Sequence, residues 1–330
     1  MVIDIFTKSG KINDYIHHVD LEAFERRKFL SCYIAEFDNC SIILDCGSSL
    51  DIDNLLNYIN RAKIPLSSIK YLITTHYHFD HNGGAWKLCN FLEKYNPNFK
   101  IITNYQTKVF LNNPQEHLAR AKRTFGNFIG DMNYIEDNAF KLIEPINKIK
   151  DFKQAKTSIE DFSLGQNKIS LGALKTPGHT LDHQCPFFIR NGKIEFLFLG
   201  EAAGTLYNSS NLKTMPTSMP IHFNYDKYMN SFENIMNLKP KVLGFAHFGV
   251  LNNYKDIKNL LNEHKTLMEQ FRKHIIKYYR ECPKTEYIYD KIMPQLIKRT
   301  DLTIKIHPLI KKIILAVIYG MLMDLGYRKD

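Results

Sequence analysis

The sequence predicts an α/β layered fold followed by a C-terminal helical region. Short apolar runs alternate with amphipathic segments over roughly the first 250 residues, a pattern typical of strands alternating with helices. With 330 residues, of which 44% are hydrophobic and 24% charged, the chain can bury a substantial core. We therefore expect a layered domain over residues 1–254 and a separate helical region over residues 255–330.

The first half of the chain shows strand and helix patterns in turn. Residues 29–45 contain two apolar runs around the turn signal Asp38-Asn39, which predicts a pair of strands. Apolar residues in 50–62 are spaced for one face of a helix. The further elements expected in this half are a strand at 70–75, a helix beginning near Ala85 and a strand at 99–104.

The middle of the chain is expected to cover the functional site and then return to strands. Residues 105–150 are mostly helical in pattern and resemble an insertion over a site. The dipeptide Asn191-Gly192 is a strong signal for a two-residue hairpin turn. Strands are expected at 168–178, 187–200 and 241–249, a helix at 227–238, and the C-terminal helices at 255–281, 285–298 and 306–327.

The charge and the cysteine content limit which classes of protein this chain can belong to. The net charge of +10 is spread along the chain without a dense basic block, so nucleic acid is not the expected partner, although it stays open. None of the six cysteines forms a CxxC pair, and the N-terminus lacks an apolar leader. The longest apolar stretch, 313–323, is about half of a membrane span. We expect a cytoplasmic protein with reduced thiols and no membrane partner.

The segment His76-Tyr77-His78-Phe79-Asp80-His81 carries the strongest chemical signal. Three imidazoles and a carboxylate follow directly after a predicted strand. Residues two apart in an extended chain point the same way, so His76 and His78 can share one metal ion. Asp80 and His81 lie beyond the strand end, where the chain can turn them toward a second ion. This spacing predicts a metal site.

Three more candidate ligands follow apolar runs later in the chain. His179 stands in the segment TPGHT, Glu201 follows FLFLG, and His247 follows KVLGFA. Side chains at strand ends are held by a rigid scaffold, as a metal site requires. We therefore expect these residues to converge with the first segment at one edge of a sheet.

The segments THYHFDHNGG, TPGHTLDH and FLGEAAG, with His247 at a strand end, resemble the successive motifs of the metallo-β-lactamase superfamily over residues 28–250. The resemblance implies an αββα sandwich. It also implies that Asp45 supports the metal loop. One metal would be bound by His76, His78 and His179, and the other by Asp80, His81 and His247.

Glu201 departs from the family pattern, which has aspartate at this position. The family residue bridges the two metals, and a longer side chain must adjust that geometry or bind one metal only. We expect two divalent cations, zinc first, with iron or manganese as alternatives, because histidine and carboxylate ligands suit all three.

The resemblance implies a hydrolase in which metal-activated water attacks the substrate and Asp80 orients the nucleophile. The appended helices resemble the glyoxalase II-like and lactonase-like branches, so we expect a small-molecule acyl substrate with an ester, thioester or lactone bond. Tyr207 and Tyr225 lie between Glu201 and His247 in sequence and are candidates for substrate binding. An apolar stripe in 313–322 suits packing either on the core or on a second subunit, so a homodimer stays open.

Other functions stay open at this point. A nuclease or phosphodiesterase of the same fold would suit the positive charge. A mononuclear iron dioxygenase of sulfur compounds, or a regulator that keeps the site without catalysis, would keep the same ligands. Among the remaining histidines, His183 suits an outer contact to the metal ligands. The others, for example His17, His18, His117 and His222, are expected to have structural roles.

Overall fold

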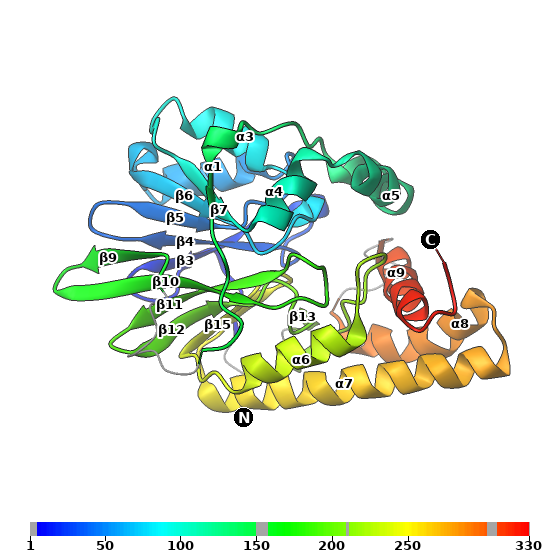
Figure 1. Cartoon of the computed structure of the whole chain (residues 1–330). Helices are drawn as coiled ribbons and strands as arrows, with labels where there is room; N and C mark the ends of the chain where they lie inside the picture. The colour runs from blue at the N-terminus through cyan, green and yellow to red at the C-terminus, as the bar shows by residue number, and fades with distance from the viewer. Residues whose placement is uncertain (1–4, 150–157, 209–210, 302–308, 330) are drawn as a thin grey trace.

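Two β-sheets packed face to face form the centre of the molecule, with helices on both outer faces (Figure 1). The computed structural model describes residues 5–149, 158–208, 211–301 and 309–329. Within these residues the predicted αββα sandwich is confirmed. The start of the last predicted helix, residues 306–308, lies outside the described residues.

The N-terminal sheet is antiparallel on one side and parallel on the other. Strands β3, β4 and β5 pair antiparallel, whereas β5, β6, β7 and β8 pair parallel. Parallel neighbours require crossover connections, and helices α1 (Ile52–Arg61) and α3 (Ala85–Leu92) supply two of them. The strand order is β2 (Gly10–Lys11), β3 (Ile16–Asp20), β4 (Ser31–Glu36), β5 (Ser41–Leu44), β6 (Ile69–Ile73), β7 (Lys100–Thr103) and β8 (Phe140–Leu142).

The second sheet is mainly antiparallel. Asn191 and Gly192 both have positive φ, 53° and 73°, as the predicted tight turn between β11 and β12 requires. Its order is β1 (Ile5–Phe6), β16 (Gly249–Leu251), β15 (Val242–Phe245), β12 (Lys193–Phe198), β11 (Gln184–Arg190), β10 (Asn167–Lys175) and β9 (Glu160–Leu164). A separate hairpin contains β13 (Thr205–Asn208) and β14 (Lys213–Met215).

Aromatic side chains fill the space between the two sheets. Tyr33 on β4 lies 5.1 Å from Phe196 and 4.9 Å from Phe198 on β12, measured between ring centroids. Its hydroxyl donates to the backbone carbonyl of Phe245 at 2.8 Å. The buried ring thus joins the sheets by packing while its polar atom is satisfied.

The helices begin where the sequence offers capping side chains. Asn104, Asn224 and Asn253 each accept a hydrogen bond from a backbone N–H in the first turn of α4, α6 and α7. The helices are α1 (Ile52–Arg61), α2 (Phe79–Asn82), α3 (Ala85–Leu92), α4 (Tyr105–Asn112), α5 (Gln115–Phe125), α6 (Tyr225–Met236), α7 (Tyr254–Glu281), α8 (Thr285–Leu296) and α9 (Leu309–Asp324). Short 3-10 turns span Ala23–Glu25, Leu66–Ser68, Gly126–Ile129, Asp137–Ala139 and Ile297–Arg299.

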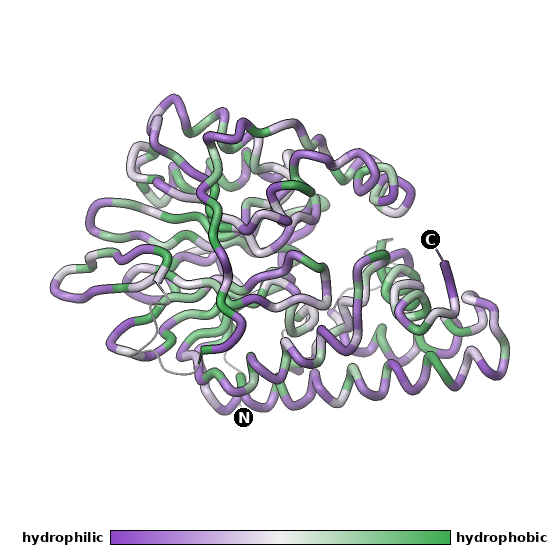
Figure 2. The backbone as a smooth tube through the Cα atoms, in the orientation of Figure 1, coloured by the Kyte–Doolittle hydropathy of each residue, from purple (hydrophilic) through white to green (hydrophobic). Residues whose placement is uncertain are grey.

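Helices α6 and α7 cover the second sheet, and α8 and α9 pack beyond it (Figure 1). Figure 2 shows hydrophobic and hydrophilic stretches alternating along α7, as an amphipathic helix requires. No helix in the described part of the chain has the length and hydropathy to cross a membrane.

The described part of segment 105–150 is mostly helical, as expected, but it also contains one strand. Its first part forms α4 and α5, but Phe140–Leu142 adds the strand β8 to the N-terminal sheet beside β7. The expectation of a helical insertion is therefore wrong for this part. A three-residue strand next to an existing sheet edge is set by its neighbour, and its own sequence is too short to show periodicity.

Candidate metal centre

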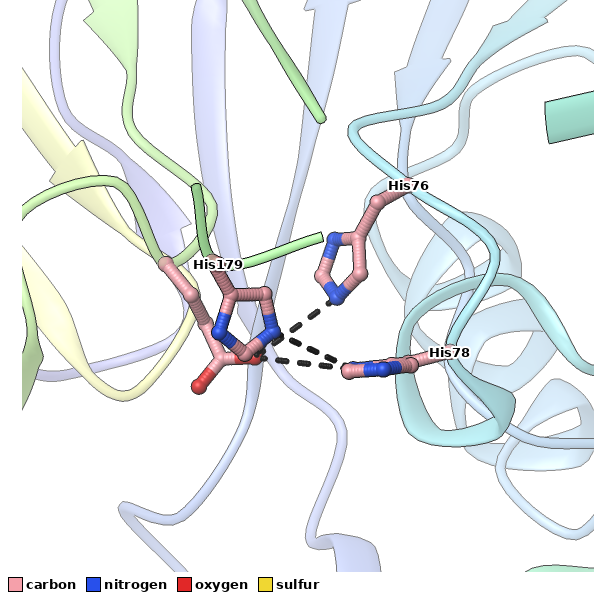
Figure 3. Close-up of side chains that lie close together, drawn as sticks. His76, His78 and His179 are labelled. Carbon is pink, nitrogen blue, oxygen red and sulfur yellow. Dashed lines mark hydrogen bonds and ion pairs between the residues drawn. The ribbon is translucent and has the colours of Figure 1, made fainter. Parts of the chain in front are cut away.

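Three imidazoles converge at the end of strand β6. His76 and His78 follow this strand, and His179 follows β10 in the opposite sheet (Figure 3). His179 Nε2 lies 3.2 Å from His78 Nδ1. These three residues and Glu201 each offer one ligand atom to a group whose atoms all lie within 4.8 Å of one another.

The Glu201 carboxylate lies at the centre of this group. Its Oε2 is 2.7 Å from His179 Nε2, 3.6 Å from His76 Nε2 and 3.9 Å from His78 Nδ1. The same oxygen is 3.4 Å from Nε2 of His81, which belongs to the neighbouring group. Despite its extra methylene, the glutamate therefore reaches both groups.

Asp80, His81 and His247 form the second group, again with ligand atoms within 4.8 Å of one another. Asp80 Oδ2 lies 3.4 Å from His247 Nε2 and 3.8 Å from His81 Nε2. Asp80 and His81 stand on the short helix α2, and His247 follows β15. The structure thus brings together all seven residues that the sequence singled out as ligands.

Asp45 anchors the loop that carries the HxHxDH segment. One carboxylate oxygen accepts from the backbone N–H of Thr75 and from Asn82 Nδ2, both at 2.7 Å. The other accepts from Thr75 Oγ1 at 2.6 Å and faces His81 Nδ1 at 3.2 Å. Because Asp45 holds the outer nitrogen of His81, the inner nitrogen is directed at the centre.

Carbonyl oxygens orient two further imidazoles. His179 Nδ1 lies 2.7 Å from the carbonyl oxygen of Thr217, and His247 Nδ1 lies 3.0 Å from that of Phe29. A carbonyl oxygen only accepts, so each Nδ1 carries the proton and each Nε2 presents its lone pair inward.

His183 holds the backbone of Glu201. Its Nε2 accepts from the Glu201 N–H at 3.1 Å, and its Nδ1 contacts Thr176 Oγ1 at 2.8 Å. It therefore lies where an outer contact to the ligands was expected.

Burial and charge set the protonation of the ligands. Burial lowers the pKa of His76 well below its usual value and that of His78 to about 4. Burial opposes the ionisation of Glu201, but the surrounding imidazoles, His179 first, outweigh it and hold its pKa well below the usual range. Burial also opposes a charge on His81, but the neighbouring carboxylates, Asp80 first, outweigh it and raise its pKa well above the usual value. Metal binding requires neutral imidazoles and ionised carboxylates, so a cation would displace the proton of His81.

Two buried imidazole nitrogens of this centre make no hydrogen bond, which favours a cation at this place. Nε2 of His76 and Nε2 of His81 are both buried without a hydrogen bond. A buried polar atom without a partner costs free energy, and a divalent cation among these donors would supply the missing interaction. The residues present therefore fit a metal centre.

Comparison with known proteins identifies the family. The family model described as the metallo-beta-lactamase superfamily matches residues 26–247. This chain belongs to the metallo-β-lactamase superfamily. Its membership, with the two groups of candidate ligands, supports a metal-dependent hydrolase.

The protein ST1585 is similar to this chain both in sequence and in structure. The metallo-beta-lactamase fold-containing protein ST1585 of Sulfurisphaera tokodaii is 26% identical over 237 residues, which cover 72% of this chain and 79% of that protein. The crystal structure of ST1585 from Sulfolobus tokodaii matches with a TM-score of 0.62 at 21% identity, covering 93% of this chain and 98% of that one.

A more distant structure is a B3 metallo-beta-lactamase described as having an active-site glutamic acid. It matches with a TM-score of 0.52 at 13% identity, covering 79% of this chain and 88% of that one. At this identity the match shows a shared fold.

The two groups of candidate ligands in this superfamily member lie at the floor of a cavity. The volume of the cavity, including its open mouth, is about 1210 Å³. Asp80, Glu201 and His247 line the floor. Apolar walls come from the aromatic residues Phe24, Phe29, Phe79, Phe110 and Phe125 and from the aliphatic residues Met219, Ile221, Ile313, Ala316 and Val317.

The two tyrosines expected near the substrate have different positions. Tyr207 lines the cavity, stacks on Phe29 at 5.0 Å and lies 5.5 Å from the His247 ring, measured between ring centroids. Tyr225 does not line the cavity, because it begins α6 with its ring against the guanidinium of Arg272. The expectation for Tyr225 is therefore wrong.

Two histidines with expected structural roles lie in the cavity instead. His117 on α5 stacks parallel to His78, with ring centroids 5.2 Å apart, and its Nε2 accepts from the Phe79 N–H at 3.1 Å. His222 also lines the cavity and stacks on Phe110. Because His117 lies in a segment that was expected to cover the site, the sequence offered a reason to place it near the cavity. Nothing in the sequence singled out His222.

Proposed function

We propose that this chain is a metal-dependent hydrolase acting on an ester, thioester or lactone. One observation carries the proposal: two adjacent groups of metal-ligand side chains form the floor of a cavity whose walls are largely apolar. Such a cavity removes an uncharged acyl substrate from water while its reactive bond contacts the polar floor.

His76, His78, His179 and Glu201 would hold one cation, and Asp80, His81 and His247 the other. A bound divalent cation lowers the pKa of a water molecule toward 7 and polarises the bond under attack. Glu201 would contact both cations, since its Oε2 reaches His179 and His81. The B3 enzyme described as having an active-site glutamic acid is a precedent for this residue type in the fold.

The other side chains would orient the reacting groups. Asp80 lines the cavity with Oδ2 facing His247, where it would accept a hydrogen bond from the attacking water. Tyr207 lines the same part of the cavity and would bind the substrate. The aromatic side chains would exclude bulk water, which strengthens each polar interaction at the floor.

The charge of the cavity favours an acyl substrate over a phosphodiester. Arg120 is the only arginine or lysine among the described lining residues, and its guanidinium pairs with Glu116 at 2.7 Å. A nucleic-acid site would present several unpaired cations to the phosphates. The positive net charge of the chain is therefore not gathered at this site.

Metal analysis combined with activity assays tests the proposal. Protein loaded with zinc, manganese or iron would be assayed on esters, thioesters, lactones and a phosphodiester. His78→Ala and His179→Ala should lose both metal and acyl hydrolysis, whereas His274→Ala, a histidine on α7 outside both groups, should keep them. Metal-loaded protein that hydrolyses only the phosphodiester, or consumes oxygen with a persulfide, would contradict it, as would one inert to every substrate.

A further inference from the structure

One wall of the cavity is built by the C-terminal helix α9. Ile313, Ala316 and Val317 line the cavity and stand three and four residues apart, which places them on one face of the helix. Lys311 and Lys312 are exposed on the same helix and do not line the cavity. This wall lies outside residues 26–247, the part that the family model matches.

Close backbone contact docks α9 onto the chain segment beside the metal ligands. Ser218 Oγ donates to the carbonyl oxygen of Val317 at 2.6 Å. One turn later, a Cβ added to Gly320 would overlap the carbonyl oxygen of Ser218, so only glycine permits this approach. The neighbouring residue Thr217 accepts the hydrogen bond of His179 Nδ1. The wall is thus fixed relative to the floor.

Helices α5 and α9, which both line the cavity, differ in polarity. Helix α5 contributes Glu116, His117, Arg120 and Thr124 besides two apolar side chains, whereas α9 contributes only aliphatic side chains. Ala316 is half-buried and its side chain is the smallest of the three, so this position on the α9 face leaves room for a ligand. A saturated hydrocarbon chain fits this face, because it offers dispersion contacts and no hydrogen-bonding group.

We propose that α9 binds the hydrocarbon chain of the acyl group, so that this protein prefers esters or thioesters of medium-chain fatty acids over those of acetate. The proposal rests on the proposed hydrolase function and names its substrate class. Each methylene buried against the wall should raise kcat/KM about fourfold until the cavity is filled.

A series of 4-nitrophenyl esters from acetate to decanoate tests the chain-length preference in zinc-loaded protein. Ala316→Trp would place a large ring where the chain binds. We expect it to lower kcat/KM for decanoate at least tenfold while acetate stays within twofold of wild type. Lys312→Trp, an exposed substitution on the same helix, should change neither value.

Ala316→Leu is a milder variant in case the tryptophan prevents folding. It should shorten the longest accepted chain by a few carbons and leave acetate unaffected, with thermal melting confirming the fold. Equal losses for acetate and decanoate in both variants, or faster hydrolysis of benzoate than of any aliphatic ester, would overturn the α9 proposal.

A binding measurement separates this proposal from the function on which it rests. Isothermal titration calorimetry with decanoate and acetate needs no turnover. One outcome is that no ester is hydrolysed, but decanoate binds wild type and Lys312→Trp at least tenfold more tightly than Ala316→Trp. The hydrolase proposal then fails, and the proposal that α9 binds the hydrocarbon chain is supported. If esters are hydrolysed without chain-length preference and decanoate binds no better than acetate, the α9 proposal fails and the hydrolase stands.

Discussion

The hydroxyl of Tyr228 lies 2.8 Å from Nε2 of His264, which joins helix α7 to the chain beside the metal ligands. The same hydroxyl accepts from the Gly204 N–H at 2.8 Å and lies 3.4 Å from both the Glu201 carbonyl oxygen and Thr217 Oγ1. One side chain of α6 thus contacts both segments that position Glu201 and His179.

Tyr228→Phe should therefore weaken both the fold and catalysis. It leaves the buried Gly204 N–H without its acceptor and Nε2 of His264 without its partner, which costs about 1–3 kcal/mol of unfolding free energy. Because the ligands lose an outer contact, kcat should fall about tenfold with little change in KM. Urea unfolding and steady-state kinetics measure the two effects.

Tyr225→Phe is the matched control, since it changes the same residue type on the same helix. Its ring lies against Arg272 and away from the cavity, so stability and kcat should stay near wild type. The visible spectrum of the cobalt-substituted protein should change in Tyr228→Phe alone. An unchanged spectrum together with a normal kcat in Tyr228→Phe would show that Tyr228 does not position the metal ligands.

Asp45→Asn should weaken metal binding without removing a ligand. Asp45 is buried and its two oxygens hold Thr75, Asn82 and the outer nitrogen of His81. An amide cannot accept at both ends, so the His81 ring loses its orientation. We expect metal affinity to fall about 10- to 100-fold, measured by competition with a chelator. Asp53→Asn, an exposed change on α1, should leave the affinity intact.

Removal of Asp80 should separate the two groups of ligands. Asp80→Ala leaves His81 and His247 without their carboxylate but keeps His76, His78, His179 and Glu201 in place. Elemental analysis should then show about one divalent cation per chain, against about two in wild type. Two cations retained in Asp80→Ala would contradict the division into groups.

His18 should make the fold sensitive to mild acid. It is fully buried, with Nδ1 on the Lys8 carbonyl and Nε2 on Ser31 Oγ, and burial lowers its pKa to about 4. The unfolded chain, with a histidine pKa near 6.5, then binds more protons between these two values. The contribution to stability is therefore complete above pH 6.5 and declines as the pH falls toward 4.

Urea unfolding of wild type at pH 7.5 and pH 4.5 should show a loss from this residue of about 2–3 kcal/mol. Other buried groups also titrate in this window, so the comparison is with His18→Gln, which keeps a polar side chain that cannot be charged. The loss on acidification should be smaller in this variant by that amount. An identical loss in the two proteins would falsify the assignment to His18.

Local sequence patterns predicted much of the fold because many turns and helices depend only on residues that are close together in the chain. The hairpin turn at Asn191-Gly192 needs two neighbouring residues with positive φ, and the structure has both. The long C-terminal helices follow from periodicity within their own segments. Strand β8 was not predicted because its three residues show no strand pattern of their own. It is a strand because it pairs with β7.

The same distinction holds for the site. His76, His78, Asp80 and His81 lie close in sequence after a strand, and His179, Glu201 and His247 each follow an apolar run, so the sequence by itself determined which residues gather. Only the tertiary structure decided that Glu201 reaches both groups, that His117, His222 and Tyr207 face the cavity and that Tyr225 does not. The physical reason is that strand ends are encoded locally, whereas the docking of α5 and α9 over the sheet edge depends on contacts between residues far apart in the chain.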